Sequence, residues 1–384
     1  IVFIKKSKGL KALGKKLKVG ILFGGRSGEH AVSLLSAASV MSAMDPGRYE
    51  IVPVGITEDG RWLAGGDPMK ALQEKDIPGD CFFASMVTDP HAPGLLLLDE
   101  GKSSRGFIPL DAVFPVLHGP YGEDGTVQGL LELAGLPYVG AGVLSSAAGM
   151  DKAVMKILFQ HRGLPVGDFL YFKSFDWASE RISLLKKIEE RLGYPCFVKP
   201  ANLGSSVGVN KADGQEALIR CIEEALRYDH KVIVEAYIRG REIECSVLGD
   251  EEPICSVPGE IVPGAEFYDY RAKYIDSSSQ LIIPASLPPE VRERIRAYAV
   301  EAFLAVECSG LGRVDFFYQE EEDRVYVSEI NTIPGFTSIS MYPKLWEASG
   351  IPYAELIDRL IDIACERHRR RSALLCSYSP PQDR

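Results

Sequence analysis

Several features that would assign a protein to a class at a glance are missing from this chain of 384 residues. It contains no apolar run near the roughly 18–20 residues that a helix needs to cross a bilayer. Its eight cysteines are scattered and form no Cys-x-x-Cys pair, which argues against a zinc site or a disulfide framework and favours a reducing compartment. Basic residues are fewer than acidic ones, 43 against 53, and the net charge of −10 argues against nucleic acid as the main partner. We therefore expect a cytoplasmic protein with neither a nucleic-acid nor a membrane partner.

Two common nucleotide-binding signatures are also missing, the P-loop with Gly-Lys-Ser/Thr and the Gly-x-Gly-x-x-Gly fingerprint. In their place, a loop containing Gly204, Ser205, Ser206 and Gly208 follows an apolar run that ends near Lys199. Such a loop exposes backbone N–H groups and hydroxyls that can surround phosphate oxygens, although the same residues suit an ordinary turn. Lys199 favours the phosphate site, because a lysine closing an apolar strand is an unusual core residue.

The order of apolar runs predicts an α/β fold in more than one domain. Strands alternate with helices through the first third of the chain, which indicates a doubly wound parallel sheet, and two smaller α+β units follow. The expected organisation is a basic, disordered leader at 1–17, an N-terminal α/β substrate domain at 18–142, a central domain at 143–238, a C-terminal domain at 239–372 and a tail at 373–384.

The apolar runs 311–319 and 324–330 flank a charged tip and predict a β-hairpin. Because side chains alternate across a strand, Arg313 and Asp315 share one face of its first strand, and Glu329 and Asn331 share one face of its second. Two carboxylates and an amide oxygen suit a hard cation such as Mg²⁺, and the neighbouring arginine suggests phosphates as its other partners. The spacing alone also fits a surface hairpin with an ordinary ion pair.

Two polar residues follow strands of the first domain. Glu29 lies in a glycine turn that enters a helix, and His118 ends an apolar run before a glycine-rich loop. Ligands of open α/β sheets bind at the carboxyl ends of the strands, so both side chains are expected at one crevice. Glu29 would hold a substrate ammonium there or simply complement the helix dipole, and a single histidine also fits a structural role.

Other charged residues carry weaker signals. Lys152 lies in an amphipathic helix pattern, where a lysine is usually solvated. Glu235 ends a strand, and Glu242 and Glu244 alternate on the next one, where we expect only one of the two to matter. Residues 259–280 form a long polar segment rich in aromatic residues, which predicts a lid loop.

Taken together, these segments resemble the D-alanine–D-alanine ligases, a family within the ATP-grasp enzymes, over nearly the whole chain from about 18 to 370. The segments that carry the resemblance are Gly24-Gly-Arg-Ser-Gly-Glu-His30, Leu117-His-Gly-Pro-Tyr-Gly-Glu-Asp-Gly125, Met150-Asp-Lys152, Val198-Lys-Pro200, Gly204-Ser-Ser-Val-Gly208, Phe267-Tyr-Asp-Tyr270, Lys273-Tyr274, Gly312-Arg-Val-Asp315 and Glu329-Ile-Asn-Thr-Ile-Pro-Gly335. The resemblance implies that the central and C-terminal domains are ATP-grasp subdomains that hold ATP between them.

The resemblance also implies roles for single residues. The implied ATP site consists of Lys152, Lys199, Ser205, Ser206, Glu235, Ala236, Ile238, Glu242 and Lys273, and the implied ligands of two Mg²⁺ ions, or of Mn²⁺ in their place, are Asp315, Glu329 and Asn331. The implied substrate residues are Glu29, His118, Arg313, Gly335, Ser340 and Met341, with Glu29, Ser205 and Tyr274 linking the lid to the other domains and Arg313 and Gly335 stabilising an oxyanion. Ala31 and Ala236 depart from the family pattern without removing a chemical role.

The resemblance implies ATP-dependent ligation of two D-alanine molecules through an acyl phosphate, for peptidoglycan precursors, by a homodimer. Two alternatives stay open. One is an ATP-grasp ligase with another product, such as D-alanyl-D-lactate or a dipeptide with another D-amino acid. The other is a nucleotide-binding protein without ligase activity, which the complete set of acids, lysines and Arg313 disfavours.

Overall fold

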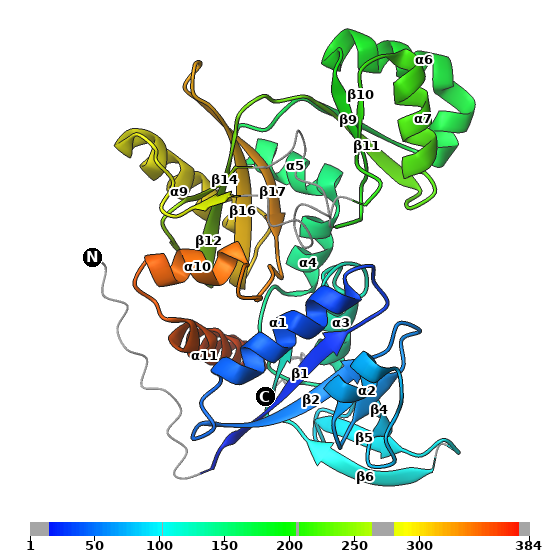
Figure 1. The fold of residues 1–384 in the computed structure, drawn as a ribbon, viewed down its shortest axis with the longest axis vertical. Coiled ribbons are helices and arrows are strands. Elements are labelled where there is room, and N and C mark those ends of the chain that lie inside the picture. The colour runs from blue at the N-terminus through cyan, green and yellow to red at the C-terminus, as the bar shows by residue number, and fades with distance from the viewer. Residues whose placement is uncertain (1–14, 102, 205–206, 263–279, 376–384) are drawn as a thin grey trace, which may run out of the picture.

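The computed structural model describes residues 15–101, 103–204, 207–262 and 280–375 of the chain. Its strands form three sheets, each drawn from a separate stretch of sequence (Figure 1). None of the helices in these described ranges is long and apolar enough to cross a membrane.

The first sheet has seven strands in the order β6-β5-β4-β3-β2-β1-β7. Its strands and their helices are β1 (Leu17–Gly24), α1 (His30–Ala43), β2 (Tyr49–Ile56), β3 (Trp62–Ala64), α2 (Pro68–Glu74), β4 (Phe82–Val87), β5 (Gly94–Leu98), β6 (Ser104–Pro109), β7 (Ala112–Pro115), α3 (Thr126–Leu133) and α4 (Val143–Met150).

The sequence predicted a parallel, doubly wound sheet here, and that prediction is confirmed only for the centre. Strand β1 is parallel to both β2 and β7, and helices α1 and α3 pack on opposite faces. Strands β3 to β6 are antiparallel to their neighbours. Most of the connections among these outer strands are too short to carry a crossover helix, and a parallel pair needs a crossover of a dozen or more residues.

The second sheet is a four-stranded antiparallel sheet in the order β10-β9-β11-β8, covered by α6 and α7. Its elements are α5 (Lys152–His161), β8 (Phe169–Lys173), α6 (Ser174–Leu192), β9 (Cys196–Pro200), β10 (Asn210–Ala212), α7 (Gln215–Ala225) and β11 (Lys231–Ala236). Asp151 caps the N-terminus of α5 by accepting hydrogen bonds from the N–H groups of Ala153 and Val154, both at 3.1 Å. This cap fixes the position of Lys152, the first residue of the helix.

The third sheet is antiparallel in the order β15-β14-β12-β16-β17, with β13 paired to β12. Its elements are β12 (Arg241–Gly249), β13 (Ile254–Cys255), β14 (Gly259–Val262), β15 (Gln280–Ile282), α9 (Pro289–Ala305), β16 (Gly310–Gln319), β17 (Arg324–Asn331), α10 (Met341–Ala348) and α11 (Tyr353–Ser372). The predicted hairpin is confirmed as β16 and β17. The predicted lid loop 259–280 is wrong at both ends, where β14 and β15 pair with each other, and 263–279 lies outside the described residues.

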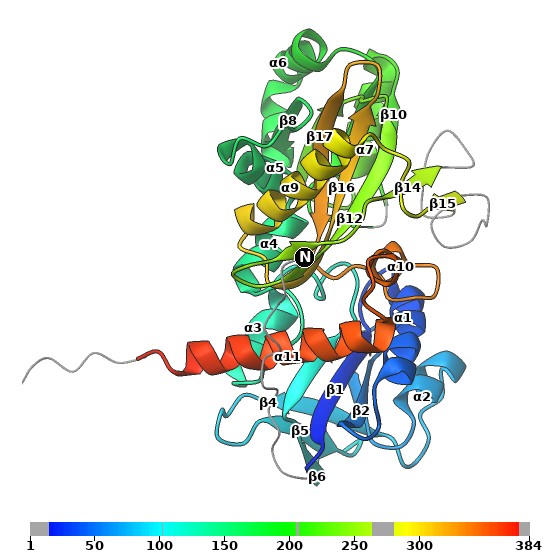
Figure 2. The same ribbon diagram turned by 90° about the vertical axis from the view of Figure 1, so that its left-hand side faces the viewer.

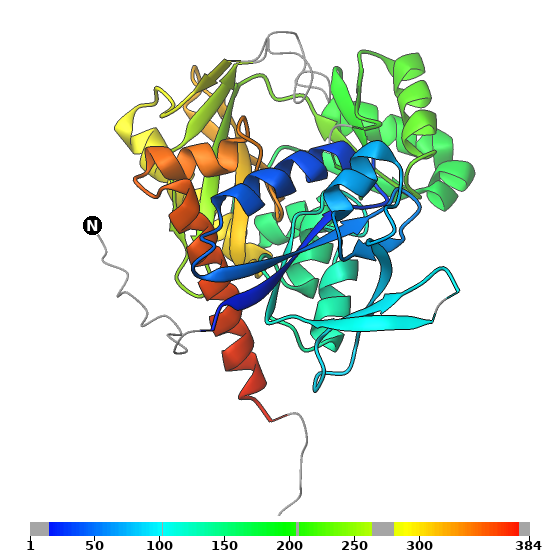
Figure 3. The same ribbon diagram turned by 60° about the horizontal axis from the view of Figure 1, so that its bottom comes forward.

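Helix α11 connects distant parts of the chain. It lies between the first and third sheets in Figure 2. Its apolar side chains recur at helical spacing and share one core with α1 and β1; those on α11 are Leu356, Ile357, Leu360, Ile361 and Ala364. Figure 3 shows the N-terminal part, in blue and cyan, in front of and between the green four-stranded unit and the yellow and orange six-stranded unit.

Candidate active site

One cavity of about 1400 Å³ is lined by residues of the second and third sheets and by loops that follow strands of the first. Every predicted site residue within the described ranges lines it; these are Glu29, His118, Lys152, Lys199, Glu235, Ala236, Ile238, Glu242, Arg313, Asp315, Glu329, Asn331, Gly335, Ser340 and Met341. Four other predicted residues, Ser205, Ser206, Lys273 and Tyr274, lie outside the described residues.

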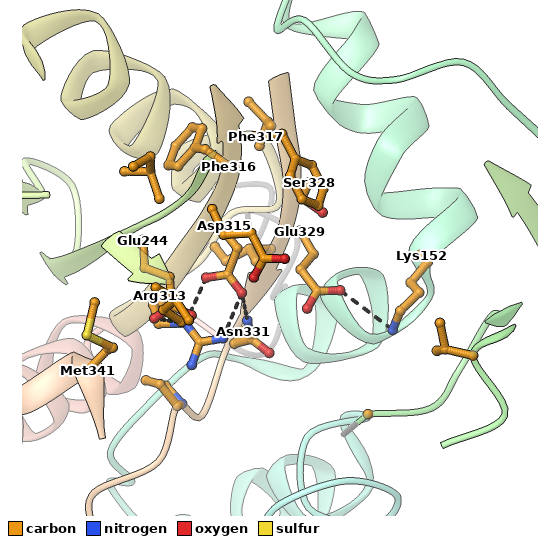
Figure 4. Close-up of a pocket in the computed structure, with 18 of the residues that line it drawn as sticks. Lys152, Glu244, Arg313, Asp315, Phe316, Phe317, Ser328, Glu329, Asn331 and Met341 are labelled. Carbon is orange, nitrogen blue, oxygen red and sulfur yellow. Dashed lines mark hydrogen bonds and ion pairs between the residues drawn. The ribbon is translucent and has the colours of Figure 1, made fainter. Parts of the chain in front are cut away.

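The β16–β17 hairpin brings the predicted metal ligands together. Asp315 lies opposite Glu329 and Arg313 opposite Asn331 in the strand register, and a register shift follows Asp315. Asp315 accepts hydrogen bonds from Arg313 Nε and Nη2, both at 2.7 Å, and from Asn331 Nδ2 at 3.0 Å (Figure 4). The cavity-facing side chains alternate with buried Val314 and Phe316, as expected for a half-buried strand.

The donor set of this hairpin fits Mg²⁺. Two carboxylates and an amide that can present its oxygen are hard oxygen ligands, and Mg²⁺ is usually bound by one or two carboxylates with water and substrate phosphates. Within the described ranges, no three His, Cys, Asp or Glu side chains cluster as a metal site. A cation at this hairpin would therefore complete its coordination with Asn331 and with oxygens from outside the protein.

Arg313 also pairs with a residue whose role the sequence left open. Glu244 Oε2 lies 3.0 Å from Arg313 Nε, and Glu244 is 6% exposed. Burial lowers the pKa of Arg313, but the charges of Asp315 and Glu244 outweigh it and raise that pKa well above its ordinary value. Arg313 is therefore a permanent cation between two carboxylates.

Three lysines reach the other side of the cavity. Lys152 Nζ donates to the carbonyl of Leu203 at 2.7 Å and lies 3.9 Å from Glu329. Glu235 bridges Lys199 and Lys156, with Nζ–O distances of 2.5 and 3.0 Å. Burial raises the pKa of Glu235, yet the two lysines more than offset it and lower the pKa to about 2.

The sequence reasoning missed Lys156. It is 5% exposed and donates to the carbonyl of Ser328 on β17 at 3.1 Å, so it joins the second and third sheets. The signal was available, because Lys156 follows Lys152 by four residues on α5 and so lies on the same helical face.

The remaining residues predicted to bind ATP also line the cavity. Ala236 ends β11, Ile238 lies in the connection to β12, and Glu242 faces the cavity from β12 opposite Phe317. The strand alternation that put Glu242 and Glu244 on one face is confirmed, since both line the cavity. Glu242 lies at the end near Ala236, and Glu244 lies beside Arg313.

Glu29 and His118 meet at the first sheet, as the topology predicted. Glu29 precedes α1, but its side chain makes no capping hydrogen bond to that helix. Its Oε2 lies instead against two loops, because a methyl group built at Gly119 or at Gly204 would come within 2.9 or 3.1 Å of it. The close approach to Gly204 places the carboxylate beside the glycine-serine loop.

His118 is held by hydrogen bonds on both ring nitrogens. Nδ1 lies 3.1 Å from the carbonyl of Ile333, and Nε2 lies 3.3 Å from Ser36 Oγ. Burial lowers the pKa of His118, and the charge of Glu29 offsets only part of that effect. The ring is therefore neutral at physiological pH.

Glu123 is a further cavity residue that the sequence reasoning missed. It accepts a hydrogen bond from the Gly119 N–H at 2.6 Å. Burial and then the charge of Glu29 raise its pKa to about 8. A carboxyl with this pKa is a functional-site candidate, and its place in the loop after His118 was the available signal.

Gly335, Ser340 and Met341 lie where β17 turns towards α10. Ser340 Oγ accepts from the Thr337 N–H at 3.0 Å and fixes the turn. A methyl group at Gly335 would lie 2.7 Å from Ser340 Oγ, so a larger residue there would force the Ser340 hydroxyl to move.

The fold and the cavity together define a class of protein. A four-stranded and a six-stranded antiparallel sheet enclose one cavity, with lysines from one side and two carboxylates and an arginine from the other. This is the architecture of the ATP-grasp ligases, and solved structures of that class superpose on nearly the whole chain.

Comparison with known proteins narrows the class to a family. The family models described as D-ala D-ala ligase N-terminus and C-terminus match residues 18–141 and 158–362. The D-alanine–D-alanine ligase of Caldicellulosiruptor bescii is 50% identical over 361 residues, which is 94% of this chain and 98% of that protein. The ligase of the same name from Natranaerobius thermophilus is 48% identical over 365 residues, which is 95% of this chain and 99% of that protein.

Two solved structures extend the comparison. The D-alanine-D-alanine ligase of Coxiella burnetii has a TM-score of 0.80 at 37% identity and covers 93% of this chain and 96% of its own. The VanG D-Ala:D-Ser ligase of Enterococcus faecalis has a TM-score of 0.82 at 37% identity and covers 91% of this chain and 100% of its own. This chain belongs to the D-alanine–D-alanine ligase family.

Proposed function

We propose that this chain joins two molecules of D-alanine into D-alanyl-D-alanine with ATP as the phosphoryl donor, for the synthesis of peptidoglycan precursors. The observation that carries this proposal is the shared cavity, which collects Glu29, the lysines, Arg313 and the acids of the hairpin from all three sheets. The family to which the chain belongs supports the choice of substrates.

In the proposed reaction the first D-alanine carboxylate attacks the γ-phosphorus of ATP, ADP leaves, and an acyl phosphate forms. The amine of the second D-alanine then attacks the acyl carbon, and phosphate leaves. Lys152 and Lys199 hold the ATP phosphates, and Glu29 holds the ammonium of the first D-alanine. Arg313 and the Gly335 N–H face the tetrahedral oxyanion, where donors fixed in advance stabilise developing charge.

The cofactor proposal adds two Mg²⁺ ions, with Mn²⁺ as a substitute, at Asp315, Glu329 and Asn331. When bound, the metal supplies charge neutralisation on the phosphate oxygens. For the adenosine, we propose Glu235, Ala236, Ile238 and Glu242. The chain's own contribution is to position the reacting groups, which is most of what phosphoryl transfer requires.

We also propose that Glu29, Ser205 and Tyr274 link the closing segments over the site, with Ser206 and Lys273 as further phosphate contacts and with Ser340 and Met341 facing the second D-alanine. The approach of Glu29 to Gly204 supports the first link, since Gly204 directly precedes Ser205. We likewise propose domain boundaries at 142 and 238, a cytoplasmic location and a homodimer.

The acceptor is the part of the proposal with a specific alternative. The D-Ala:D-Ser ligase structure matches this chain as well as a D-alanine–D-alanine ligase structure does. D-serine, and D-lactate as a hydroxy acid, are therefore the competing acceptors.

The test is ADP release in the presence of ATP, Mg²⁺ and a panel of D-alanine, D-serine, D-lactate and L-alanine, followed by mass analysis of the products. We expect release to depend on D-alanine and D-alanyl-D-alanine to predominate in mixtures. Absence of D-alanine-dependent release would refute the ligase, and a mixed dipeptide or depsipeptide as main product would refute the acceptor.

A further inference from the structure

Three charged side chains form an acid–arginine–acid row in the wall of the cavity, with Glu244 buried and Arg313 and Asp315 half-buried. Glu244 on β12 lies directly opposite Asp315 on β16 in the strand register. Two carboxylates facing each other on neighbouring strands repel. The guanidinium of Arg313, which also projects from β16, lies between them and contacts both (Figure 4).

The hydrogen atoms of Arg313 are not shared evenly in this row. Its Nε carries a single hydrogen, which it donates to Asp315 Oδ1 at 2.7 Å, and Nη2 donates to Asp315 Oδ2 at 2.7 Å. Glu244 Oε2 lies 3.0 Å from the same Nε. Arg313 therefore uses both oxygens of Asp315, while a second carboxylate lies within reach of the same N–H.

The arrangement creates a competition at Asp315. A divalent cation held by Asp315 would compete for the oxygens that Arg313 now engages, and it would place positive charge beside a guanidinium that keeps its own charge. A buried cation that loses its partner carries a large desolvation penalty. Arg313 therefore needs another carboxylate, and Glu244 is 6% exposed and already in contact.

We propose that Glu244 is a positioning residue that holds Arg313 in the site when Asp315 turns its oxygens to a divalent cation. The proposal rests on the metal site and ligase activity proposed above. In this role Glu244 acts through Arg313, first by neutralising it and then by accepting its Nε–H. The guanidinium thereby stays aimed at the reaction centre.

The chain provides a matched control on the adjacent strand. Glu260 on β14 is 7% exposed and accepts from Arg241 Nε at 2.8 Å and from Nη2 at 2.7 Å. Glu260 is therefore also a buried, arginine-bound glutamate that lines the cavity, but its arginine does not contact Asp315. Glu260→Gln removes the same kind of charge pair without removing the alternative partner of Arg313.

The experiment measures Mn²⁺ binding by electron paramagnetic resonance with protein saturated with ADP, so that no turnover is needed. The proteins are the unmodified chain and the variants Glu244→Gln, Glu260→Gln and Glu329→Gln. We expect Glu244→Gln to bind Mn²⁺ about tenfold more weakly, the order expected when a unit charge is removed close to a cation in a partly buried site. Glu260→Gln should stay within about twofold of the unmodified chain, because the lost charge lies beside another arginine.

Activity gives a second readout. Glu244→Gln should raise the Mg²⁺ concentration needed for half-maximal turnover, and added Mg²⁺ should restore part of the rate. If Glu244→Gln does not unfold cooperatively, Glu244→Asp serves instead, since its carboxylate keeps the charge but is too short to reach Nε. We expect that variant to bind Mn²⁺ about threefold more weakly.

The outcomes separate the two levels of the proposal. Equal Mn²⁺ affinity in the unmodified chain and the Glu244 variant, with weaker binding in Glu329→Gln, refutes the positioning role alone. Equal losses in the Glu244 and Glu260 variants also refute it, because the effect would then be general. Mn²⁺ binding that Glu329→Gln leaves unchanged overturns the metal site, and the positioning role with it.

Discussion

At the scale of single residues, the cavity is organised by pairs in which a buried charge has more than one partner. Glu235 contacts Lys156 and Lys199, and Arg313 contacts Asp315 and Glu244. In each case one partner is a residue that we propose to bind ligand. The second partner keeps the buried charge compensated when the first turns to the ligand.

Lys156→Met should destabilise the fold by about 2–3 kcal/mol at neutral pH. This is less than the cost of leaving a buried charge without any partner, because Glu235 still pairs with Lys199. The pKa of Glu235 is lowered to about 2 from an ordinary value of 4.5. The ionised Glu235 therefore stabilises the folded chain above pH 4.5, and this stabilisation is lost as the pH falls towards 2.

Removal of Lys156 should raise that pKa, so the variant and the unmodified chain should converge in stability below pH 4. Urea unfolding at pH 7 and pH 3.5 measures this difference. Lys186→Met, at a lysine that is 74% exposed, is the control and should change the free energy of unfolding by less than about 0.5 kcal/mol. A difference that stays constant with pH contradicts the role given to Lys156.

Glu123→Gln should stabilise the ligand-free protein by an amount that grows as the pH rises from 4.5 to about 8. The pKa of Glu123 is raised to about 8 from 4.5, so between these values the folded chain binds a proton that the unfolded chain has released. The free energy of unfolding therefore falls as the pH rises through that window. Glutamine mimics the protonated form and avoids the loss.

Since Glu123 keeps some exposure, we expect a gain of about 1–2 kcal/mol at pH 8.5 and almost none at pH 5. Thermal unfolding at both pH values, with Glu58→Gln as an exposed control, tests it. A gain of equal size at both pH values would show that packing rather than ionisation is responsible.

At the scale of elements, α11 holds the N-terminal sheet against the C-terminal one. Its apolar stripe packs in one core with α1 and β1. Near its basic end, Arg367 donates to the carbonyls of Gly140 at 2.5 Å and Tyr138 at 2.9 Å. The relative position of Glu29 and Arg313 thus depends on a helix that contributes no residue to the cavity.

Leu360→Ala should lower the free energy of unfolding by about 2–5 kcal/mol, because Leu360 is fully buried in that shared core. Arg359→Ala is the matched change on the exposed side of the same helix, where its pair with Glu355 contributes about 0.3–0.5 kcal/mol. Guanidinium unfolding followed by circular dichroism measures both. Similar small effects of the two substitutions would mean that α11 does not stabilise the contact between the sheets.

At the scale of the whole molecule, the cavity is shared by all three sheets, so its ligands bind residues that are far apart in sequence. Glu29, Lys199 and Asp315 reach it from three separate sheets or their loops. Ligand binding should therefore stabilise the molecule as a whole rather than one part of it.

A non-hydrolysable ATP analogue with Mg²⁺ should raise the melting temperature, because a ligand at about 100 times its Kd adds about 2.7 kcal/mol to the free energy of unfolding. For a chain of this size that corresponds to a rise on the order of 2–4 °C. Asp315→Asn should reduce the part of the rise that depends on Mg²⁺ and keep the part that nucleotide gives alone. Thermal unfolding with and without Mg²⁺ separates the two parts, and no response of the unmodified chain to nucleotide would contradict the ATP site.

Much of this protein is determined locally and could be predicted from the sequence. Strand alternation put Arg313 and Asp315 on one face of a hairpin, and glycine turns after strands placed Glu29 and His118 at one crevice. These features depend on residues within a few positions of each other, where the period of the backbone fixes which side chains share a face.

Only the tertiary structure determines which distant residues pack against these faces of the strands and helices. The pairing of Lys156 with Glu235 and of Glu244 with Arg313, the antiparallel extension β3 to β6, and the place of α11 all depend on contacts between distant segments. Lysine and glutamate on an amphipathic element look alike in sequence whether they face water or a buried partner, because the local pattern does not encode which surface packs against them. Only the packing of the three sheets removes these charges from water, and that burial makes their pairing matter.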